Sequence, residues 1–304
     1  MLENDSFWDF YWETRLLAMD HLGKQTAVLA ASRLIRLLAG QVDHPLRLLE
    51  LGCGEGQMIG TLLDAHAQVC ASQASVGVDY NARSLAVCRR DYPSLHCVEG
   101  DFTNAEVLAS LGKFELVLLV NALHEVFSAS FSPERGEVDI AVGKQRVEQA
   151  LAGAASCLAA DGWLILFDGL EPPEDPLERV HIRFRDEQSY RKFQAFTHGY
   201  HPFRIEYHQL EDPLSIELSR RSFTRYITKS IFLGKKLWET ERLESYQYFT
   251  EEEYRSAFAR QGLKIHQLRT MTMNEEKWNR QVEILSENVH FPEEHILILA
   301  MRMD

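Results

Sequence analysis

The sequence predicts an α/β protein built on a doubly wound, mostly parallel sheet, with helices before the sheet and a helical insertion within it. Short apolar segments alternate with segments of helical periodicity between residues 47 and 168, and a glycine-rich turn directly follows the first apolar segment. Strands separated by helices form parallel crossover units, and such sheets bind ligands beyond the carboxyl ends of their strands. We therefore expect the functional residues in the loops that follow the strands.

Seven strands and their connecting helices account for most of the core. Two helices are expected before the sheet, because apolar residues recur at helical spacing from Phe7 to Leu38 and Gly23 and Gly40 mark helix ends. The expected strands are short apolar runs at residues 47–51, 76–79, 96–98, 116–120, 163–168, 263–270 and 295–302. The helices expected between them cover residues 57–67, 84–90, 105–111, 144–160 and 250–261.

An insertion is expected after Asp168, where the alternation stops. Residues 171–176 (EPPEDP) can continue neither a strand nor a helix, and the alternation resumes only near residue 250. Before the last strand, Trp278, Val282, Leu285 and Val289 recur at helical spacing. The predicted parts are an N-terminal helical cap at residues 1–40, a core at residues 41–168 and 246–304, and a lid insertion at residues 169–245.

A basic segment lies within this insertion. Residues 219–238 contain six lysines or arginines and no acid, and their apolar residues form a stripe at helical spacing. We read the segment as an amphipathic helix. Its basic face is either solvated, balancing the acidic body of the protein, or attracts an anionic substrate.

Composition narrows the class of protein. The 304 residues carry a formal net charge of -13, which disfavours binding to nucleic acid. The five cysteines include no CxxC pair, and the histidines His198, His201 and His208 fit no zinc pattern, so we expect no disulfide framework and no metal. The first ten residues carry three acids where a signal peptide needs a basic start, and no apolar run approaches the ~20 residues of a membrane span. We expect a cytoplasmic protein without a membrane segment.

The glycine turn, Glu50-Leu51-Gly52-Cys53-Gly54-Glu55-Gly56, is the strongest functional signal. Three glycines let the backbone pass close to a ligand, and the helix that follows presents free N–H groups to a negative ligand group. A dinucleotide fingerprint needs its third glycine one residue later, where this chain has Gln57. The acid Glu50 is better explained as a partner for a ligand ammonium than for pyrophosphate. A tight turn without any ligand is the structural alternative.

The turn resembles the first motif of the class I S-adenosylmethionine-dependent methyltransferases, and the resemblance extends over residues 46–168 and from about Tyr246 to the C-terminus. It implies that the last of the seven strands is antiparallel and that the cofactor is S-adenosylmethionine, with S-adenosylhomocysteine as product. It also implies a set of cofactor-binding residues: Glu50, Gly52, Cys53, Gly54, Gly56, Asp79, Tyr80, Asp101, Phe102, Asn121 and Ala122.

The resemblance assigns roles to the strand ends. Asp79 would bind the ribose hydroxyls, and Asp101 would accept from the adenine amino group while Phe102 packs on the ring. Both acids could instead cap the helices that follow them. The loop that begins at Asn121 faces the methyl group in the family. It lacks the Asn/Asp-Pro-Pro-aromatic signature of enzymes that methylate nucleic-acid amines, which indicates another kind of substrate.

His124 is the candidate catalytic residue, because an imidazole titrates near neutrality and could take a proton from a hydroxyl or amine. The alternative is that it only lines the pocket. Glu125 and Asp168 are expected to be helix-capping or surface carboxylates. Tyr11, in the aromatic first helix, could cover the cofactor site and contact the substrate.

The predicted function is methyl transfer from S-adenosylmethionine to a small-molecule acceptor that could carry an anionic group. The insertion is expected to determine that acceptor, since its position allows it to cover the pocket. A protein methyltransferase and a non-catalytic cofactor-binding module remain as alternatives, and a nicotinamide oxidoreductase is a further one. The sequence says nothing of the oligomeric state.

Overall fold

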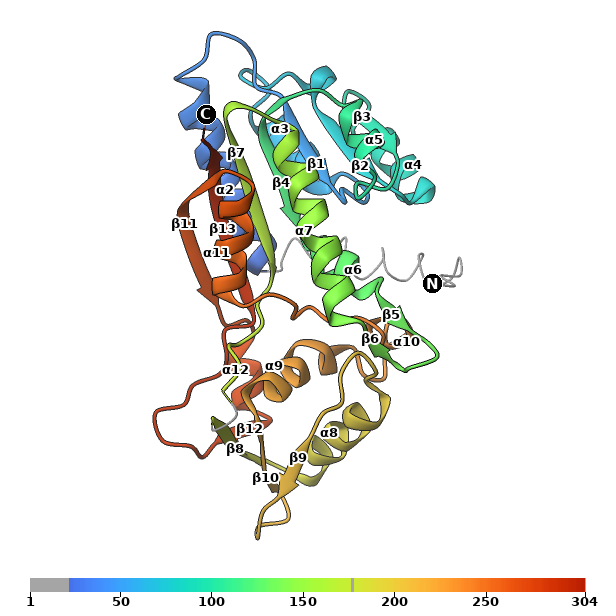
Figure 1. Cartoon of the computed structure of the whole chain (residues 1–304), viewed down its shortest axis with the longest axis vertical. Coiled ribbons are helices and arrows are strands. Elements are labelled where there is room, and N and C mark those ends of the chain that lie inside the picture. Colours follow the sequence, from blue (N-terminus) through green and yellow to red (C-terminus); the bar gives the residue numbers. More distant parts are fainter. Residues whose placement is uncertain (1–21, 176–177, 304) are drawn as a thin grey trace.

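The computed structural model describes residues 22–175 and 178–303. Figure 1 shows two units along the long axis: a large sheet flanked by helices, and a smaller α/β unit beyond one end of its strands. The first expected helix and Tyr11 lie outside the described residues. Within these residues, no helix combines the length and the apolar character that a membrane crossing requires.

The large unit is a sheet of seven strands in the order β11-β13-β7-β4-β1-β2-β3. Strand β13 is antiparallel to both of its neighbours, and the other pairings of this sheet are parallel, as the sequence predicted. The chain order reverses between β1 and β4, which creates the crevice where such sheets bind ligands. The strands are β1 (Leu48–Leu51), β2 (Val76–Asp79), β3 (His96–Glu99), β4 (Phe114–Val120), β7 (Leu158–Gly169), β11 (Leu263–Met271) and β13 (His295–Arg302).

Helices cover both faces of this sheet (Figure 1). Strands such as β4 are buried along their whole length, which explains why they read as continuous apolar runs. One face packs on α5 (Ala105–Ala109), α6 (Leu123–Ser128), α7 (Ile140–Ser156) and α11 (Glu251–Arg260). The other packs on α2 (Leu22–Ala39), α3 (Gln57–Ala65) and α4 (Ala82–Asp91).

Some local boundaries differ from the prediction. Helix α7 begins at Ile140, ahead of the expected Lys144, because the Asp139 side chain caps it by accepting from the Val142 N–H. A small hairpin of β5 (Phe131–Ser132) and β6 (Glu137–Val138) precedes it. A 3-10 turn, η2 (Ser72–Ala74), leads into β2.

The smaller unit contains the expected helices and also a sheet that the sequence did not reveal. Four antiparallel strands run in the order β12-β8-β10-β9. They are β8 (Arg179–Phe184), β9 (Tyr207–Gln209), β10 (Ser215–Ser219) and β12 (Val282–Ile284). The helical elements are α8 (Glu187–Gly199), α9 (Arg220–Lys229), η3 (Ser230–Phe232), α10 (Trp238–Glu241) and α12 (Glu275–Asn279).

Strand β12 corrects two expectations. Trp278 to Val289 does not form one helix, because Val282 pairs with Phe184 in the second sheet while Trp278 lies in the short helix α12. Both side chains belong to the core of the smaller unit, together with Phe184 and Phe223. The insertion therefore consists of residues 178–245 and a second segment near residues 275–291, which the expected boundary at residue 246 had assigned to the core.

The basic segment is also unlike its prediction. The helix ends at Lys229, and a turn at Gly234 with a φ of +77° separates it from α10. Residues 222–229 are all buried, so the expected solvated face is wrong for this part of the segment. The Arg225 guanidinium lies 2.5 Å from the carboxylate of Glu171, and acids elsewhere in the fold likewise neutralise Lys229. Buried cations need such partners.

Candidate functional site

The glycine turn at the end of β1 has the backbone that its sequence predicts. Gly52, Gly54 and Gly56 all adopt positive φ angles, of +76°, +54° and +72°, which side chains strongly disfavour. The backbone N–H of Gly52 donates to the Val78 carbonyl at 2.9 Å, which ties the turn to β2. A Cβ atom at Gly52 would lie 3.0 Å from that of Ala122. A side chain at Gly52 would therefore crowd the residues that follow β4, so glycine is required at this position.

Glu50 lies beneath this turn and is only 4% exposed. One carboxylate oxygen accepts from the Ile59 N–H of helix α3 at 3.1 Å. Burial raises the pKa of the Glu50 carboxyl to about 8, while the hydrogen bond from Ile59 and the charge of Lys24 oppose this increase. The sequence predicted this acid as a cofactor partner, and the structure places it directly at the turn.

Asp79 links β2 to the same turn. Its Oδ2 accepts from the Gly54 N–H at 2.7 Å, and its Oδ1 accepts from the Asn81 N–H at 2.8 Å. Burial raises the pKa of Asp79, and these backbone hydrogen bonds lower it. Helix α4 is capped by Asn81 and not by Asp79, so the capping alternative does not explain this acid. Tyr80, beside it, is half exposed.

Cys53 differs from the other residues of the turn. Its side chain points away from the surface, since a Cβ atom built on Gly77 would lie 2.8 Å from the Cys53 sulfur. Cys88 lies beneath the turn as well, and its sulfur is 2.9 Å from that of Cys97. Only the backbone of Cys53 is thus placed to contact a ligand.

Asp101 and Phe102 follow β3 at the same edge of the sheet. Asp101 is exposed, and its Oδ1 accepts from both the N–H and the hydroxyl of Thr103, at 2.8 and 2.7 Å. The next helix is capped by Asn104, so Asp101 shapes the loop before it. Phe102 is buried, with its ring 3.6 Å from the position that a Cβ atom of Gly52 would occupy. The ring thus forms one wall beside the glycine turn.

Asn121 and Ala122 end β4 opposite the turn. Asn121 has a left-handed φ of +53°, and its N–H donates to the Phe167 carbonyl at 2.8 Å. Such a conformation is costly for most residues and tolerated by asparagine. Its side-chain Oδ1 is buried and has no hydrogen-bond partner among the described residues.

His124 lies in the first turn of α6 and is 1% exposed. Its Nδ1 is 2.8 Å from Asp168 Oδ1, and since a carboxylate accepts, Nδ1 carries the hydrogen. The other oxygen of Asp168 accepts from the Leu123 N–H, so this acid caps α6, although it is buried and not on the surface. The His124 ring is stacked on that of Tyr246, with centroids 3.9 Å apart.

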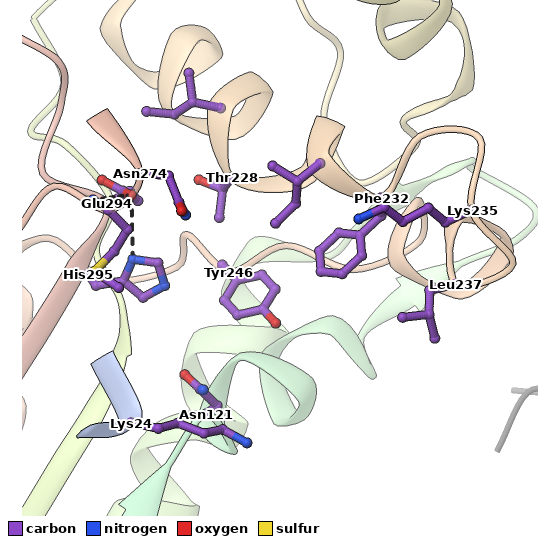
Figure 2. A pocket seen from close by; sticks show the side chains of 13 residues that line it. Lys24, Asn121, Thr228, Phe232, Lys235, Leu237, Tyr246, Asn274, Glu294 and His295 are labelled. Carbon is purple, nitrogen blue, oxygen red and sulfur yellow. Dashed lines mark hydrogen bonds and ion pairs between the residues drawn. The ribbon is translucent and has the colours of Figure 1, made fainter. Parts of the chain in front are cut away.

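A cavity of about 220 Å³ lies next to these residues, between the sheet edge and the insertion. Figure 2 shows Glu294, His295 and Asn274 on one side, Phe232, Lys235 and Leu237 on the other, and Tyr246 between them. Asn121 and Lys24 lie on the core side of the cavity (Figure 2). The other lining residues come mainly from helix α9 and the residues after it: Ile227, Thr228, Ile231 and Met273.

Sequence reasoning missed most of this wall. Tyr246, Asn274, Glu294 and Lys24 belong to loops or helices far from the glycine motif, and none has a recognisable spacing to another. His124 itself does not line the cavity, because Tyr246 lies over it. The one local signal that could have marked Glu294 in the sequence is its position directly before the last predicted strand.

The comparisons with known proteins support the interpretation of the glycine turn as part of a methyltransferase domain. Residues 48–133 match the sequence model of a methyltransferase domain. The matched segment is therefore a methyltransferase domain. The matched segment contains β1 to β4 and every residue that the sequence predicted to contact the cofactor, and S-adenosylmethionine is the cofactor of this methyltransferase core. A search of curated proteins found no match.

Several solved structures are similar to this methyltransferase at low sequence identity. Magnesium protoporphyrin IX methyltransferase from Synechocystis PCC 6803, with bound S-adenosylhomocysteine, is 12% identical with a TM-score of 0.47, over 93% of this chain and 84% of that one. A TehB-like methyltransferase from Corynebacterium glutamicum is 14% identical with a TM-score of 0.44, over 97% and 96%. An O-methyltransferase family 2 protein from Planctomyces limnophilus, in complex with apigenin, is 14% identical with a TM-score of 0.44, over 86% and 52%.

Proposed function

We propose that this methyltransferase acts on a small molecule that enters the cavity between the sheet edge and the insertion. The composition of the cavity wall carries the proposal, because Asn121 at the end of β4 and helix α9 of the insertion line the same space. Strands β1 and β4 are neighbours, so a cofactor on the glycine turn would lie beside Asn121. An acceptor in the cavity would then meet the cofactor at this residue.

The residues around the turn fit the cofactor. In our proposal the turn from Gly52 to Gly56 and Glu50 hold its amino-acid part, and Asp79 holds the ribose. The two oxygens of Asp79 each accept one backbone hydrogen bond, and a carboxylate oxygen can accept a second. The adenine ring would pack on Phe102, with Asp101 and Tyr80 at its edge. Ala122 and the Cys53 backbone complete the contact.

The cavity indicates the size and polarity of the acceptor. A closed apolar cavity of about 150 Å³ can bind benzene, so a space of about 220 Å³ suits roughly one substituted ring. Its walls are mainly apolar, and Lys24 and Lys235 are the cations that line it. We infer an acceptor with a compact apolar body and an anionic group near Lys235. A protein segment would need a longer groove.

The insertion selects the acceptor in this proposal. Residues 178–245 and 275–291 share one hydrophobic core, separate from the two cores of the large sheet. The insertion therefore forms the lid as a packed unit, while residues 41–168 and the strands β11 and β13 form the methyltransferase core. Changes in the lid can alter the cavity without disturbing the cofactor turn.

His124 has a positioning role in our proposal, in place of the base role that its sequence suggested. Its Nδ1 is committed to Asp168, and Tyr246 lies between its ring and the cavity. Holding Tyr246 in a fixed orientation would keep one wall of the acceptor site in place. Fixed walls favour transfer by holding the reacting atoms in line.

When bound, S-adenosylmethionine supplies a methyl group on a positive sulfur, which needs little covalent assistance from the protein. The contribution of this chain is therefore to orient the acceptor and to exclude water. The apolar side chains Ile227, Ile231 and Phe232 of the lid face the cavity and would displace water from it.

Incubation with S-adenosylmethionine labelled in its methyl group tests the proposal. The protein is mixed with a cell extract separated into small molecules, proteins and nucleic acids. We expect label in the small-molecule fraction. Label only in the protein fraction would establish a protein methyltransferase instead, and cofactor binding without any labelled product would favour a non-catalytic module.

The anionic group is tested at Lys235. Once the labelled product has identified the acceptor, Lys235→Gln should raise the KM for that acceptor about tenfold. One charge-assisted contact contributes roughly 1.4 kcal/mol to binding. The neighbouring Lys236 does not line the cavity, so Lys236→Gln serves as the matched control. Equal KM values for the two variants would contradict an anionic group at this position.

A further inference from the structure

Glu294 is a buried acid on the wall of the acceptor cavity, and only one of its oxygens is used by the fold. The side chain is 3% exposed, and its Oε1 accepts from the Met273 N–H at 2.6 Å. Its Oε2 has no hydrogen-bond partner among the described residues. Protein interiors rarely leave a carboxylate oxygen unpaired, and where they do, a ligand is one explanation.

The backbone holds this carboxylate in place. Glu294 directly precedes β13, its carbonyl accepts from the Leu170 N–H at 2.9 Å, and its N–H donates to the Met271 carbonyl at 3.1 Å. His295 is an ionisable neighbour, with Nδ1 3.8 Å from Glu294 Oε1, and its ring is stacked on Phe167. The backbone is thus anchored on both sides, while Oε2 has no partner among the described residues and belongs to a residue of the cavity wall.

A second unpaired oxygen lines the same cavity. Asn121 Oδ1 is buried and has no partner among the described residues. Asn121 directly follows β4 and Glu294 directly precedes β13, with β7 between the two strands, so their backbones are separated by roughly 10 Å at a strand spacing of about 4.8 Å. Both oxygens accept hydrogen bonds and neither donates, so they would meet two different donor groups on one molecule.

We propose that the acceptor carries a protonated amine that binds Glu294 Oε2, and a second donor, the group to be methylated, beside Asn121. A buried carboxylate prefers a cationic donor over a neutral one, because the opposite charge and the charge-assisted hydrogen bond offset the cost of burying the carboxylate. Lys235 lies on the opposite side of the cavity (Figure 2). The acceptor class is therefore a small amphoteric molecule, with an amine at one end and an anionic group at the other. This inference rests on the proposed function.

Two variants test the role of Glu294. Glu294→Gln retains an oxygen for the Met273 N–H and removes the charge, and Glu293→Gln changes the exposed neighbour as a matched control. With the labelled cofactor and a small-molecule extract, we expect Glu294→Gln to lower product formation at limiting extract at least tenfold. Glu293→Gln should match the wild type, and both variants should bind S-adenosylhomocysteine normally. Equal product formation by the two variants would overturn the assignment.

The charge of the labelled product gives a measurement that does not depend on any variant. In a strongly acidic eluent carboxylates are neutral and amines are charged, so the product of the wild-type protein should be retained by a cation exchanger. A labelled small molecule that passes through would overturn the amine while the proposed function stands. No labelled small molecule at all would overturn the proposed function itself.

The free protein supplies a third measurement. An unpaired buried carboxylate destabilises the fold in the absence of its ligand, so Glu294→Gln should raise the melting temperature by about 2 °C. A lower melting temperature would show that the carboxylate stabilises the fold, and would overturn its assignment to a ligand.

Discussion

The pKa of Glu50 predicts that cofactor binding depends on pH. In the free protein burial raises this pKa from 4.5 to about 8, so the carboxyl is protonated at neutral pH. The charged groups that face it are Lys24, which favours the carboxylate, and Asp79 and Cys88, which oppose it. The ammonium of the cofactor adds a positive charge in the proposed site. Binding should therefore lower the pKa of Glu50 and release a proton.

The size of the effect follows from the pKa. For each pH unit below 8, loss of this proton costs about 1.4 kcal/mol, a factor of ten in affinity. The affinity for S-adenosylmethionine should therefore increase up to tenfold per unit between about pH 5.5 and about pH 7. This window lies below the pKa of an α-amino group, about 7.7–8.0, so the cofactor itself stays charged.

Isothermal titration calorimetry measures this linkage. Near pH 7, titrations in buffers of different ionisation enthalpy should show release of about 0.9 proton per bound cofactor, the fraction of Glu50 that is protonated there. Two controls isolate the residue and the charge. Glu50→Gln should bind without the pH dependence, and 5′-methylthioadenosine, which lacks the amino-acid part, should release no proton. A flat affinity for the wild type, or an unchanged slope in Glu50→Gln, would refute the reasoning.

The same carboxyl has an effect on the stability of the free protein. A raised pKa in the folded state means that folding favours the protonated form, so the contribution of Glu50 is fully present below pH 4.5 and is lost as the pH rises towards 8. The loss amounts to at most roughly 5 kcal/mol in the free energy of unfolding. Saturation with the cofactor should reduce this loss, which thermal unfolding at several pH values can show.

Three further variants test the packing of the site. Gly56→Ala should weaken cofactor binding more than tenfold, because its Cβ atom would lie 2.3 Å from a buried thiol; Gly262→Ala, at a similar positive φ in open space, controls for backbone strain. Lys229→Met should destabilise the protein by about 3–5 kcal/mol in thermal or urea unfolding, since it removes the buried cation that forms ion pairs with Glu241 and Glu244. The exposed Lys192→Met should be nearly neutral. His124→Asn should keep kcat within tenfold of the wild type; a loss of 10²–10⁴ would restore the base role.

The core of the fold was predictable because its signals are local. Strands buried on both faces read as short apolar runs, and β13 was predicted at its observed bounds, His295 to Arg302. The glycine turn needs only consecutive residues, so the close approach of its backbone to a ligand and the class of that ligand could be inferred together. The acids Asp79 and Asp101 could be located because Asp79 ends a strand that was itself predicted and Asp101 lies just after another.

The second sheet was not predictable because its pairings are not local. Strand β12 joins β8 across almost a hundred residues of chain, and its three residues are too few to show an alternating pattern. Trp278 and Val282 fit a helical period by coincidence. The burial of Arg225 likewise depends on Glu171, which lies far away in the sequence. The sequence shows that a segment is rich in cations. The acids that pair with these cations in the interior are identified only by the three-dimensional structure.

The burial of these cations bears on how the acceptor is recognised. The cations of the basic segment were expected either to be solvated or to attract an anionic substrate. Most of these cations have neither role. Arg225 is paired with Glu171, and Lys229 with Glu241, so these cations neutralise buried acids of the protein. Of that segment, Lys235 lines the acceptor cavity as a cation. In our proposal, recognition of an anion depends on Lys235 of the lid, whereas Glu294 lies beside the first residue of β13 in the core sheet. In our proposal, an acceptor held by both would bridge the lid and the core, so its binding would join the two units.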